Sequence, residues 1–183
     1  MEFKKLAIDG LIVIEPRVFD DERGFFLERY VKRVFLENGV KPDFVQDNHS
    51  RSTRGVLRGL HFQAPPHSQD KLVWVVSGEI FDVAVDLRVG SPTYGQHEAI
   101  VLSAENKKMI FVPAGFAHGL QVLSDTADVL YKINDYYFPE LDGGILWSDP
   151  ALNIKWPLPN PIVSEKDQKH PLLKNFNSPF NYV

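Results

Sequence analysis

Short segments in which apolar residues alternate with other side chains constrain this fold more than any other feature of the sequence. In the clearest one, residues 79–88, an apolar residue occupies every second position from Phe81 to Leu87. Glycine, proline, serine or asparagine separates the similar runs, at residues 56–63, 71–77, 97–103, 109–112, 119–124 and 129–134. A period of two is typical of strands, and the one early helix-like stretch, residues 31–38, ends at Gly39. Many short strands without alternating helices predict an all-β antiparallel sandwich or barrel.

The character of the chain changes at Pro139, because seven of its 13 prolines lie at or beyond this position. Proline cannot donate a hydrogen bond to a sheet, so this part is expected to be irregular. It still carries apolar side chains such as Trp147, Leu152 and Trp156, each of which gains about 1.5 to 3 kcal/mol on burial. We therefore expect an irregular wrap that packs on the barrel, and one domain over residues 1–183.

Charge and cysteine content exclude several classes of function. The chain has 20 Lys and Arg, 24 Asp and Glu and a net charge of −4, so neither a nucleic acid nor an anionic membrane is an expected partner. It has no cysteine, which excludes disulfides and thiolate chemistry and favours the cytoplasm. The N-terminal apolar run, residues 11–14, is too short for a signal peptide or a membrane span.

A basic cluster in residues 51–63 is the first candidate site. Arg51, Arg54 and Arg58 precede His61, with two glycines among them, and guanidinium groups offer paired donors to phosphate or carboxylate. Strand parity places Arg58 and His61 on opposite faces, but a bulge at one of the glycines would bring both into one pocket. The alternative is a solvated turn and a histidine with a local hydrogen bond.

Further titratable residues lie on the apolar faces of other predicted strands. Lys71 lies in line with valines, so it either extends to the strand end or points into a polar cavity. His118 follows a Pro-Ala-Gly turn and needs a hydrogen-bond partner or a ligand, while Tyr131 alternates with valine and isoleucine. Together they suggest a barrel interior lined with titratable groups that holds a small ligand.

Several ordered motifs resemble one known family. The chain reads GVLRGLHFQ from position 55, KLVWVVSGEIFDVAVDLR from 71, SAENK from 103, PAGFAHG from 113, LYKINDYY from 130, DPALNIKWP from 149 and SEKDQ from 164. These motifs resemble the dTDP-4-dehydrorhamnose 3,5-epimerase family from residue 21 to residue 172. The resemblance implies a cupin-like antiparallel jelly-roll β-barrel with a few short helices and an irregular C-terminal wrap. It also implies epimerisation at C3 and C5 of a dTDP-4-dehydro-6-deoxy-D-glucose, in dTDP-L-rhamnose biosynthesis.

The resemblance implies a role for each candidate residue. His61 is the expected base, Tyr131 the acid, Asp167 the carboxylate that orients His61, and Lys71 the cation that stabilises the enolate. The expected nucleotide contacts are Arg23, Glu28, Gln46, Asn48, Arg58, His118, Tyr137, Asp142 and Lys166, with Tyr137 stacking on thymine. Arg23 and Glu28 are expected from a neighbouring subunit, so the active unit would be a homodimer that exchanges an N-terminal strand.

The same motifs bear on metal binding and on the alternatives. Pro113, Gly115 and His118 resemble the second cupin motif, but the first departs from it, because His61 is followed by Phe62 and Gln63 in place of a second histidine. We therefore expect no metal and no cofactor. The alternatives are an epimerase that acts at only C3 or C5, a metal-dependent cupin oxygenase and a sugar-binding cupin without activity.

Overall fold

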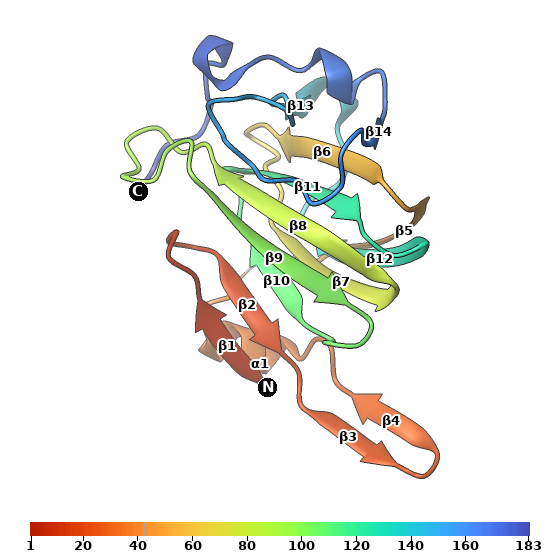
Figure 1. Cartoon of the computed structure of the whole chain (residues 1–183). Coiled ribbons are helices and arrows are strands. Elements are labelled where there is room, and N and C mark those ends of the chain that lie inside the picture. Colours follow the sequence, from red (N-terminus) through yellow and green to blue (C-terminus); the bar gives the residue numbers. More distant parts are fainter. Residues whose placement is uncertain (42) are drawn as a thin grey trace.

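Two sheets face each other and form the body of the molecule (Figure 1). The computed structural model describes residues 1–41 and 43–183. The first sheet has the order β1 (Glu2–Lys5), β2 (Ile12–Glu15), β10 (Met109–Val112), β7 (Lys71–Ser77), β12 (Thr126–Ile133) and β5 (Gln46–Thr53). The second has the order β13 (Asp142–Gly144), β6 (Val56–Gln63), β11 (Phe116–Val122), β8 (Glu79–Asp86) and β9 (His97–Ser103), and β14 (Ile162–Val163) pairs parallel with β6. The expected jelly roll is confirmed as a flattened barrel whose ladders form two sheets.

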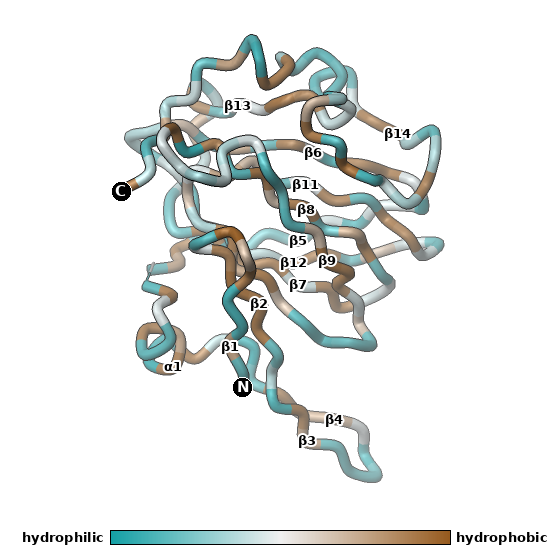
Figure 2. Tube along the Cα trace, turned by 60° about the vertical axis from the view of Figure 1, so that its left-hand side comes forward, coloured by the Kyte–Doolittle hydropathy of each residue, from teal (hydrophilic) through white to brown (hydrophobic). Residues whose placement is uncertain are grey.

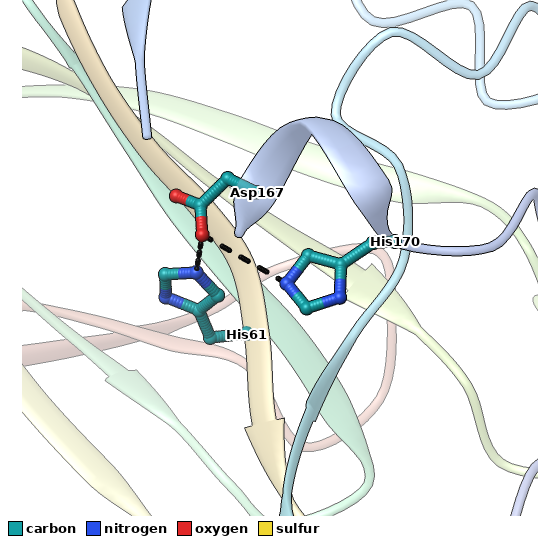
Figure 3. Close-up of side chains that lie close together, drawn as sticks. All are labelled: His61, Asp167 and His170. Carbon is teal, nitrogen blue, oxygen red and sulfur yellow. Dashed lines mark hydrogen bonds and ion pairs between the residues drawn. The ribbon is translucent and has the colours of Figure 1, made fainter. Parts of the chain in front are cut away.

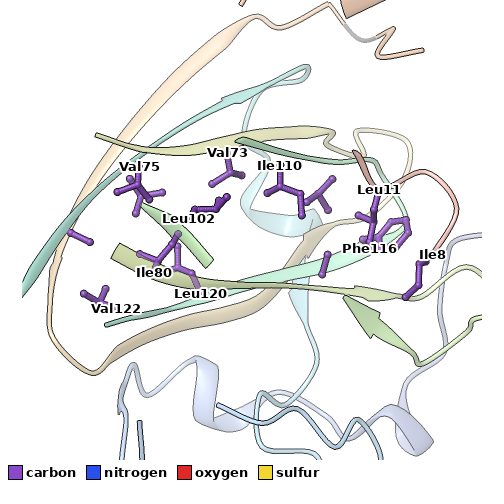
Figure 4. Packing of buried hydrophobic residues seen from close by; sticks show 14 residues of the cluster. Ile8, Leu11, Val73, Val75, Ile80, Leu102, Ile110, Phe116, Leu120 and Val122 are labelled. Atoms are coloured by element: carbon purple, nitrogen blue, oxygen red, sulfur yellow. The ribbon is translucent and has the colours of Figure 1, made fainter. Parts of the chain in front are cut away.

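The hydrophobic core fills one end of the space between these sheets (Figure 4). Val73 and Val75 come from β7 of the first sheet, and Ile80, Leu102 and Leu120 from the second. All five are buried. These branched side chains pack against each other from the two sheets and so fix the distance between the sheets. Beside the core, the same distance leaves space for a ligand.

Strand β8 is buried on both faces, although the alternation of apolar and other residues in its sequence is typical of a strand with one exposed face. Val83 and Val85 point away from the barrel interior and pack against the C-terminal wrap, with Ile145 and Phe180. The opposite face, with Ile80 and Ala84, points inward. Asp82 shares that inward face and is completely buried. A strand covered on both sides explains why its polar positions are not exposed.

The predicted wrap is confirmed. It contains the short helices η1 (Pro139–Leu141), η2 (Asp167–Lys169) and η3 (Leu173–Asn175), and its chain lies over β6 and β8 (Figure 1). Apolar stretches along it alternate with hydrophilic ones (Figure 2). The early helix is also confirmed in a shorter form, α1 (Lys32–Glu37), and Gly39 adopts the left-handed conformation after it.

A hairpin of β3 (Val18–Asp21) and β4 (Gly24–Leu27) extends away from both sheets (Figures 1 and 2). Its two strands pair only with each other among the described residues. The strand expected to be exchanged between subunits was the N-terminal one, but β1 pairs with β2 of its own chain. The exchange of a strand between subunits stays a prediction, and the hairpin is the N-terminal segment without a partner sheet among the described residues. No helix in the described part of the chain has the length and apolar character needed to cross a bilayer.

Candidate functional site

A cavity of about 760 Å³ opens between the two sheets, beside the core. Its volume is in the range of pockets that enclose a small organic ligand. The structure brings eleven of the expected residues to its wall: Gln46, Asn48, Arg58, His61, Lys71, His118, Tyr131, Tyr137, Asp142, Lys166 and Asp167. Apolar residues between them, among them Val73, Leu120 and Val129, exclude water from the polar groups.

His61 and Tyr131 reach this cavity from different sheets. His61 lies on β6 of the second sheet and Tyr131 on β12 of the first. Because the sheets face each other, the imidazole and the phenol stand on opposite walls of one cavity. A ligand between them is therefore open to proton transfer on both of its faces.

A β-bulge explains how Arg58 and His61 share this cavity. On β11, His118 pairs with His61 and Leu120 with Arg58, so two steps on β11 match three on β6. The extra residue changes the parity of the strand, which confirms the expected bulge. Gly59 permits it, because its φ is +141° and a Cβ there would lie 2.6 Å from the Cα of Gly119.

Asp167 holds the imidazole of His61 in one orientation (Figure 3). Its Oδ1 lies 2.7 Å from Nε2 of His61, and its Oδ2 accepts a hydrogen bond of 3.1 Å from the backbone N–H of Gly59. Burial favours a higher pKa for Asp167, but these hydrogen bonds and the charge of His61 outweigh it and lower the pKa below its usual range. An ionised Asp167 accepts a hydrogen bond from an N–H at Nε2 of His61, and in that tautomer the lone pair of Nδ1 is left for a substrate.

Lys71 lies in the polar cavity, which decides between its two predicted placements. Burial lowers the pKa of its amine to about 8, although Asp142 and Asp82 oppose this shift. A lysine with such a pKa still carries its charge at neutral pH. Its ammonium is weakly solvated, so it interacts strongly with an anion formed in the cavity.

Tyr131 keeps its proton at neutral pH. Burial raises the pKa of its phenol, and the nearby charge of Arg58 opposes part of that shift. The guanidinium of Arg58 is held by a hydrogen bond of 3.0 Å from its Nε to Oγ of Ser52. The remaining donors of Arg58 have no hydrogen-bond partner in residues 1–41 and 43–183 and can bind an anion in the cavity.

His118 is fixed by a carboxylate of the neighbouring strand. Its Nε2 lies 2.9 Å from both carboxylate oxygens of Asp82. The alternative considered from the sequence was a hydrogen bond to the backbone.

At the mouth of the cavity, Tyr137 donates a hydrogen bond of 2.8 Å to Asp142, and Lys166 forms an ion pair with the same carboxylate. These three residues join the loop after β12 to the C-terminal wrap.

Arg23 and Glu28 are the two expected site residues that the structure keeps away from this cavity. Arg23 lies in the turn of the hairpin, pairs with Asp21 and is 84% exposed, and Glu28 follows β4. Neither lines the cavity of its own chain. This placement is what a contribution to a neighbouring subunit requires.

The cupin metal position does not fit this chain. Gln63 stands where a second histidine would lie, and its side chain is committed to the backbone. Its Nε2 donates hydrogen bonds to the carbonyl oxygens of His67 and Tyr136, and its Oε1 accepts one from the N–H of Phe138. This amide supports the loop that carries Tyr137 and is not available as a ligand.

Sequence reasoning missed His170 and the pairing of His118 with Asp82. His170 lies next to His61 beside the same carboxylate, with its Nε2 3.8 Å from Oδ1 of Asp167 and its ring centroid 5.8 Å from that of His61 (Figure 3). A spacing of three residues places two side chains on one side of a 3₁₀ helix. The spacing from Asp167 to His170 therefore carried a signal, but the charged run around it indicated a solvated loop.

Comparison with known proteins gives consistent results. The family model described as dTDP-4-dehydrorhamnose 3,5-epimerase matches residues 5–175. The chain is 56% identical to the dTDP-4-dehydrorhamnose 3,5-epimerase of Pseudomonas aeruginosa, over 92% of this chain and 94% of that one, and 54% identical to that of Shigella flexneri, over 91% and 93%. A crystal structure of dTDP-6-deoxy-D-glucose-3,5-epimerase from Legionella pneumophila, in complex with dTDP-4-keto-L-rhamnose, is 47% identical, with a TM-score of 0.95 over 100% of this chain and 98% of that one.

Proposed function

The chain belongs to the dTDP-4-dehydrorhamnose 3,5-epimerase family, and from this membership we propose how its cavity performs the family's reaction. The protein is an isomerase that inverts C3 and C5 of dTDP-4-dehydro-6-deoxy-D-glucose and so forms dTDP-4-dehydro-L-rhamnose. The observation that carries the proposal is the position of His61 and Tyr131 on opposite walls of one cavity.

The substrate's own carbonyl makes the reaction possible. A ketone at C4 acidifies the hydrogens on C3 and C5, because the electron pair of either C–H bond delocalises onto oxygen as an enolate. Nδ1 of His61 takes the proton from one face of the ring. Tyr131 gives its phenolic proton to the same carbon from the other face, which inverts the centre. Both groups then exchange protons with water, and the second carbon follows by the same steps.

Lys71 stabilises the charge that develops between these two steps. Its ammonium is directed at the C4 oxygen and interacts more strongly with an enolate than with a neutral ketone. Asp167 keeps His61 in the tautomer that accepts a proton at Nδ1 and stabilises the imidazolium that results. It acts through His61 and does not contact the sugar.

The remaining lining residues bind the nucleotide. Arg58 and Lys166 supply cationic donors for the diphosphate, with His118 beside them, and Gln46 and Asn48 supply amides from β5. Tyr137, at the mouth, stacks on the thymine base, next to Asp142. This group of cations explains a basic cluster in a chain of net negative charge.

The active unit is a homodimer in this proposal. The β3–β4 hairpin exposes Phe19, Phe25 and Phe26 by 46%, 58% and 65%, so each gains about half of the roughly 1.5 to 3 kcal/mol of full burial if a partner covers it. A hairpin seated on a second copy carries Arg23 and Glu28 toward that copy's cavity. The absence of cysteine agrees with a cytoplasmic enzyme.

Isotope exchange tests this function directly. The protein is incubated in D₂O with dTDP-4-dehydro-6-deoxy-D-glucose, and the sugar is analysed by NMR. We expect deuterium at both C3 and C5. Label at one carbon only assigns the chain to the single-site epimerases, and no label at either carbon contradicts the proposal.

A further inference from the structure

His170 lies beside His61 and Asp167, and the three side chains together offer three potential metal ligands. Oδ1 of Asp167 lies 2.7 Å from Nε2 of His61 and 3.8 Å from Nε2 of His170, and the ligand atoms of all three lie within 4.8 Å of one another (Figure 3). Ligands of a tetrahedral zinc with bonds of roughly 2.0 to 2.2 Å lie about 3.4 Å from one another, so the closest two of these donors must separate and the most distant two must approach to bind one ion.

His170 is held there without a hydrogen bond of its own. Its Nε2 is the one buried side-chain nitrogen or oxygen in the described chain without a partner, and at 3.8 Å the carboxylate of Asp167 is too far to accept from it. The backbone leaves room for the ring at Gly144, where a Cβ would lie 2.6 Å from that nitrogen. A buried polar atom without a partner is costly, and a cation between His170 and Asp167 satisfies it.

We propose that His61, Asp167 and His170 form an inhibitory site for a divalent transition-metal ion such as Zn²⁺. Two imidazoles and one carboxylate are a donor set that zinc favours, and a water in the cavity completes a tetrahedron. This site shares only His61 with the cupin metal position, since Asp167 and His170 come from the C-terminal wrap.

Metal binding and catalysis exclude each other at this site. An ion on Nε2 of His61 displaces the proton that this nitrogen donates in a hydrogen bond to Asp167, and the neutral ring then carries its proton on Nδ1. That nitrogen can no longer take a proton from the sugar. The ion also occupies Oδ1 of Asp167, which removes the group that orients the base. This inhibitory consequence rests on the proposed function, but metal binding itself does not.

Two measurements on the full chain test the proposal. Zinc is titrated against isotope exchange and reversed with EDTA, and Co²⁺ is titrated without substrate while its visible absorption is recorded. We expect wild type to lose exchange with zinc, to regain it with EDTA, and to bind one Co²⁺ with the intense bands of a tetrahedral site. His170→Leu and His170→Gln should keep near wild-type exchange without metal and require at least about tenfold more zinc for half inhibition, since affinity depends on the number of ligands.

His49→Gln is the matched control, because His49 also forms a pair with a carboxylate, at 2.9 Å from Asp128, outside the cavity. It should keep the zinc sensitivity of wild type. Equal sensitivity of wild type and both His170 variants, or no Co²⁺ band in wild type, overturns the proposal. A chain that binds Co²⁺ through His170 but shows no exchange at all contradicts the proposed function and leaves the metal site standing.

Discussion

At the scale of single residues, the proposed chemistry depends on two side chains that do not touch each other. His61 and Tyr131 come from different sheets and meet only through a ligand in the cavity. Each is held by its own surroundings: His61 by the carboxylate of Asp167, and Tyr131 by the neighbouring apolar residues of β12. Their substitutions should therefore impair proton transfer and leave nucleotide binding nearly unchanged.

We predict that His61→Ala and Tyr131→Phe each lower turnover by about 10²- to 10⁴-fold, the usual contribution of a general acid or base. Turnover is measured by deuterium exchange and dTDP affinity by calorimetry. Tyr94→Phe, which removes a hydroxyl outside the cavity, is the control and should behave as wild type. Wild-type exchange by His61→Ala would show that the base is assigned incorrectly.

The charge of Lys71 predicts a pH dependence. The ammonium exists below its pKa, and burial places that pKa at about 8, so kcat/KM should fall as the pH rises through about 8. Lys71→Met should reduce kcat by about 10²- to 10³-fold, the loss typical of one donor to a developing oxyanion. A profile that stays flat to pH 10 in wild type would remove Lys71 from this role.

At the scale of elements, the bulge in β6 is the feature that assembles the site. Without it, Arg58 and His61 would point to opposite faces, and the nucleotide and the base would be separated by the sheet. Its close approach to β11 leaves no room for a side chain at Gly59. The bulge also brings the N–H of Gly59 to Asp167, so one local irregularity positions both the strand and the carboxylate.

Gly59→Ala should therefore destabilise the protein and reduce its activity. A Cβ at this position lies 2.6 Å from the backbone of Gly119, whereas one at Gly55, which also has positive φ, meets nothing within 4 Å. Gly55→Ala should lower the free energy of unfolding only by the backbone strain, about 1 to 2 kcal/mol. Gly59→Ala should lower it by more than that. Urea denaturation measures both. Equal losses of unfolding free energy in the two variants would mean that β11 moves away from residue 59 at no cost in stability.

Of the 14 strands in the described residues, the seven from β6 to β12 were predicted from the sequence, whereas β1 to β5, β13 and β14 were not. The limits of β6, β7, β9 and β10 agree with the short apolar runs bounded by turn residues. β5 was missed, because the face it turns inward carries Gln46, Asn48 and Ser50, which line a polar cavity in place of a hydrophobic core. A strand that borders a ligand site lacks the apolar pattern by which strands are found.

The candidate site was predictable only in part. The polar residues on apolar faces, such as Lys71 and His118, indicated a lined interior without help from any relative. The role of Asp167 came from family resemblance, because nothing local in a charged run reveals a partner 106 residues earlier in the chain. His170 was missed although it follows Asp167 by three residues, because the charged run around it indicated a solvated loop. Long-range pairs of this kind are fixed by the packing of the wrap, which the sequence does not display.

At the scale of the whole molecule, the hairpin and the wrap have different roles. The wrap buries Ile145, Leu152 and Phe180 against the second sheet, and a single domain over residues 1–183 stays a prediction. The hairpin contributes nothing comparable to its own chain and leaves its phenylalanines in water. Exposed aromatic residues on an extended arm are typical of a surface that a partner covers.

We predict that replacing both Phe25 and Phe26 with Asp converts a homodimer into a monomer, observed by analytical ultracentrifugation. The monomer should remain folded, because neither side chain belongs to a core cluster. Arg23→Ala should keep the dimer and weaken dTDP binding if Arg23 reaches the neighbouring cavity. A wild-type chain that sediments as a monomer, or an Arg23→Ala variant with unchanged affinity, would contradict this arrangement.

The late position of Asp167 in the chain has a consequence for biosynthesis. While the protein is being made on the ribosome, both sheets can assemble with His61 and Tyr131 in place before the segment that carries Asp167 has emerged. The nascent barrel would then offer a nucleotide pocket with an unoriented base. Enzymatic turnover should therefore begin only when the segment that carries Asp167 has docked beside His61.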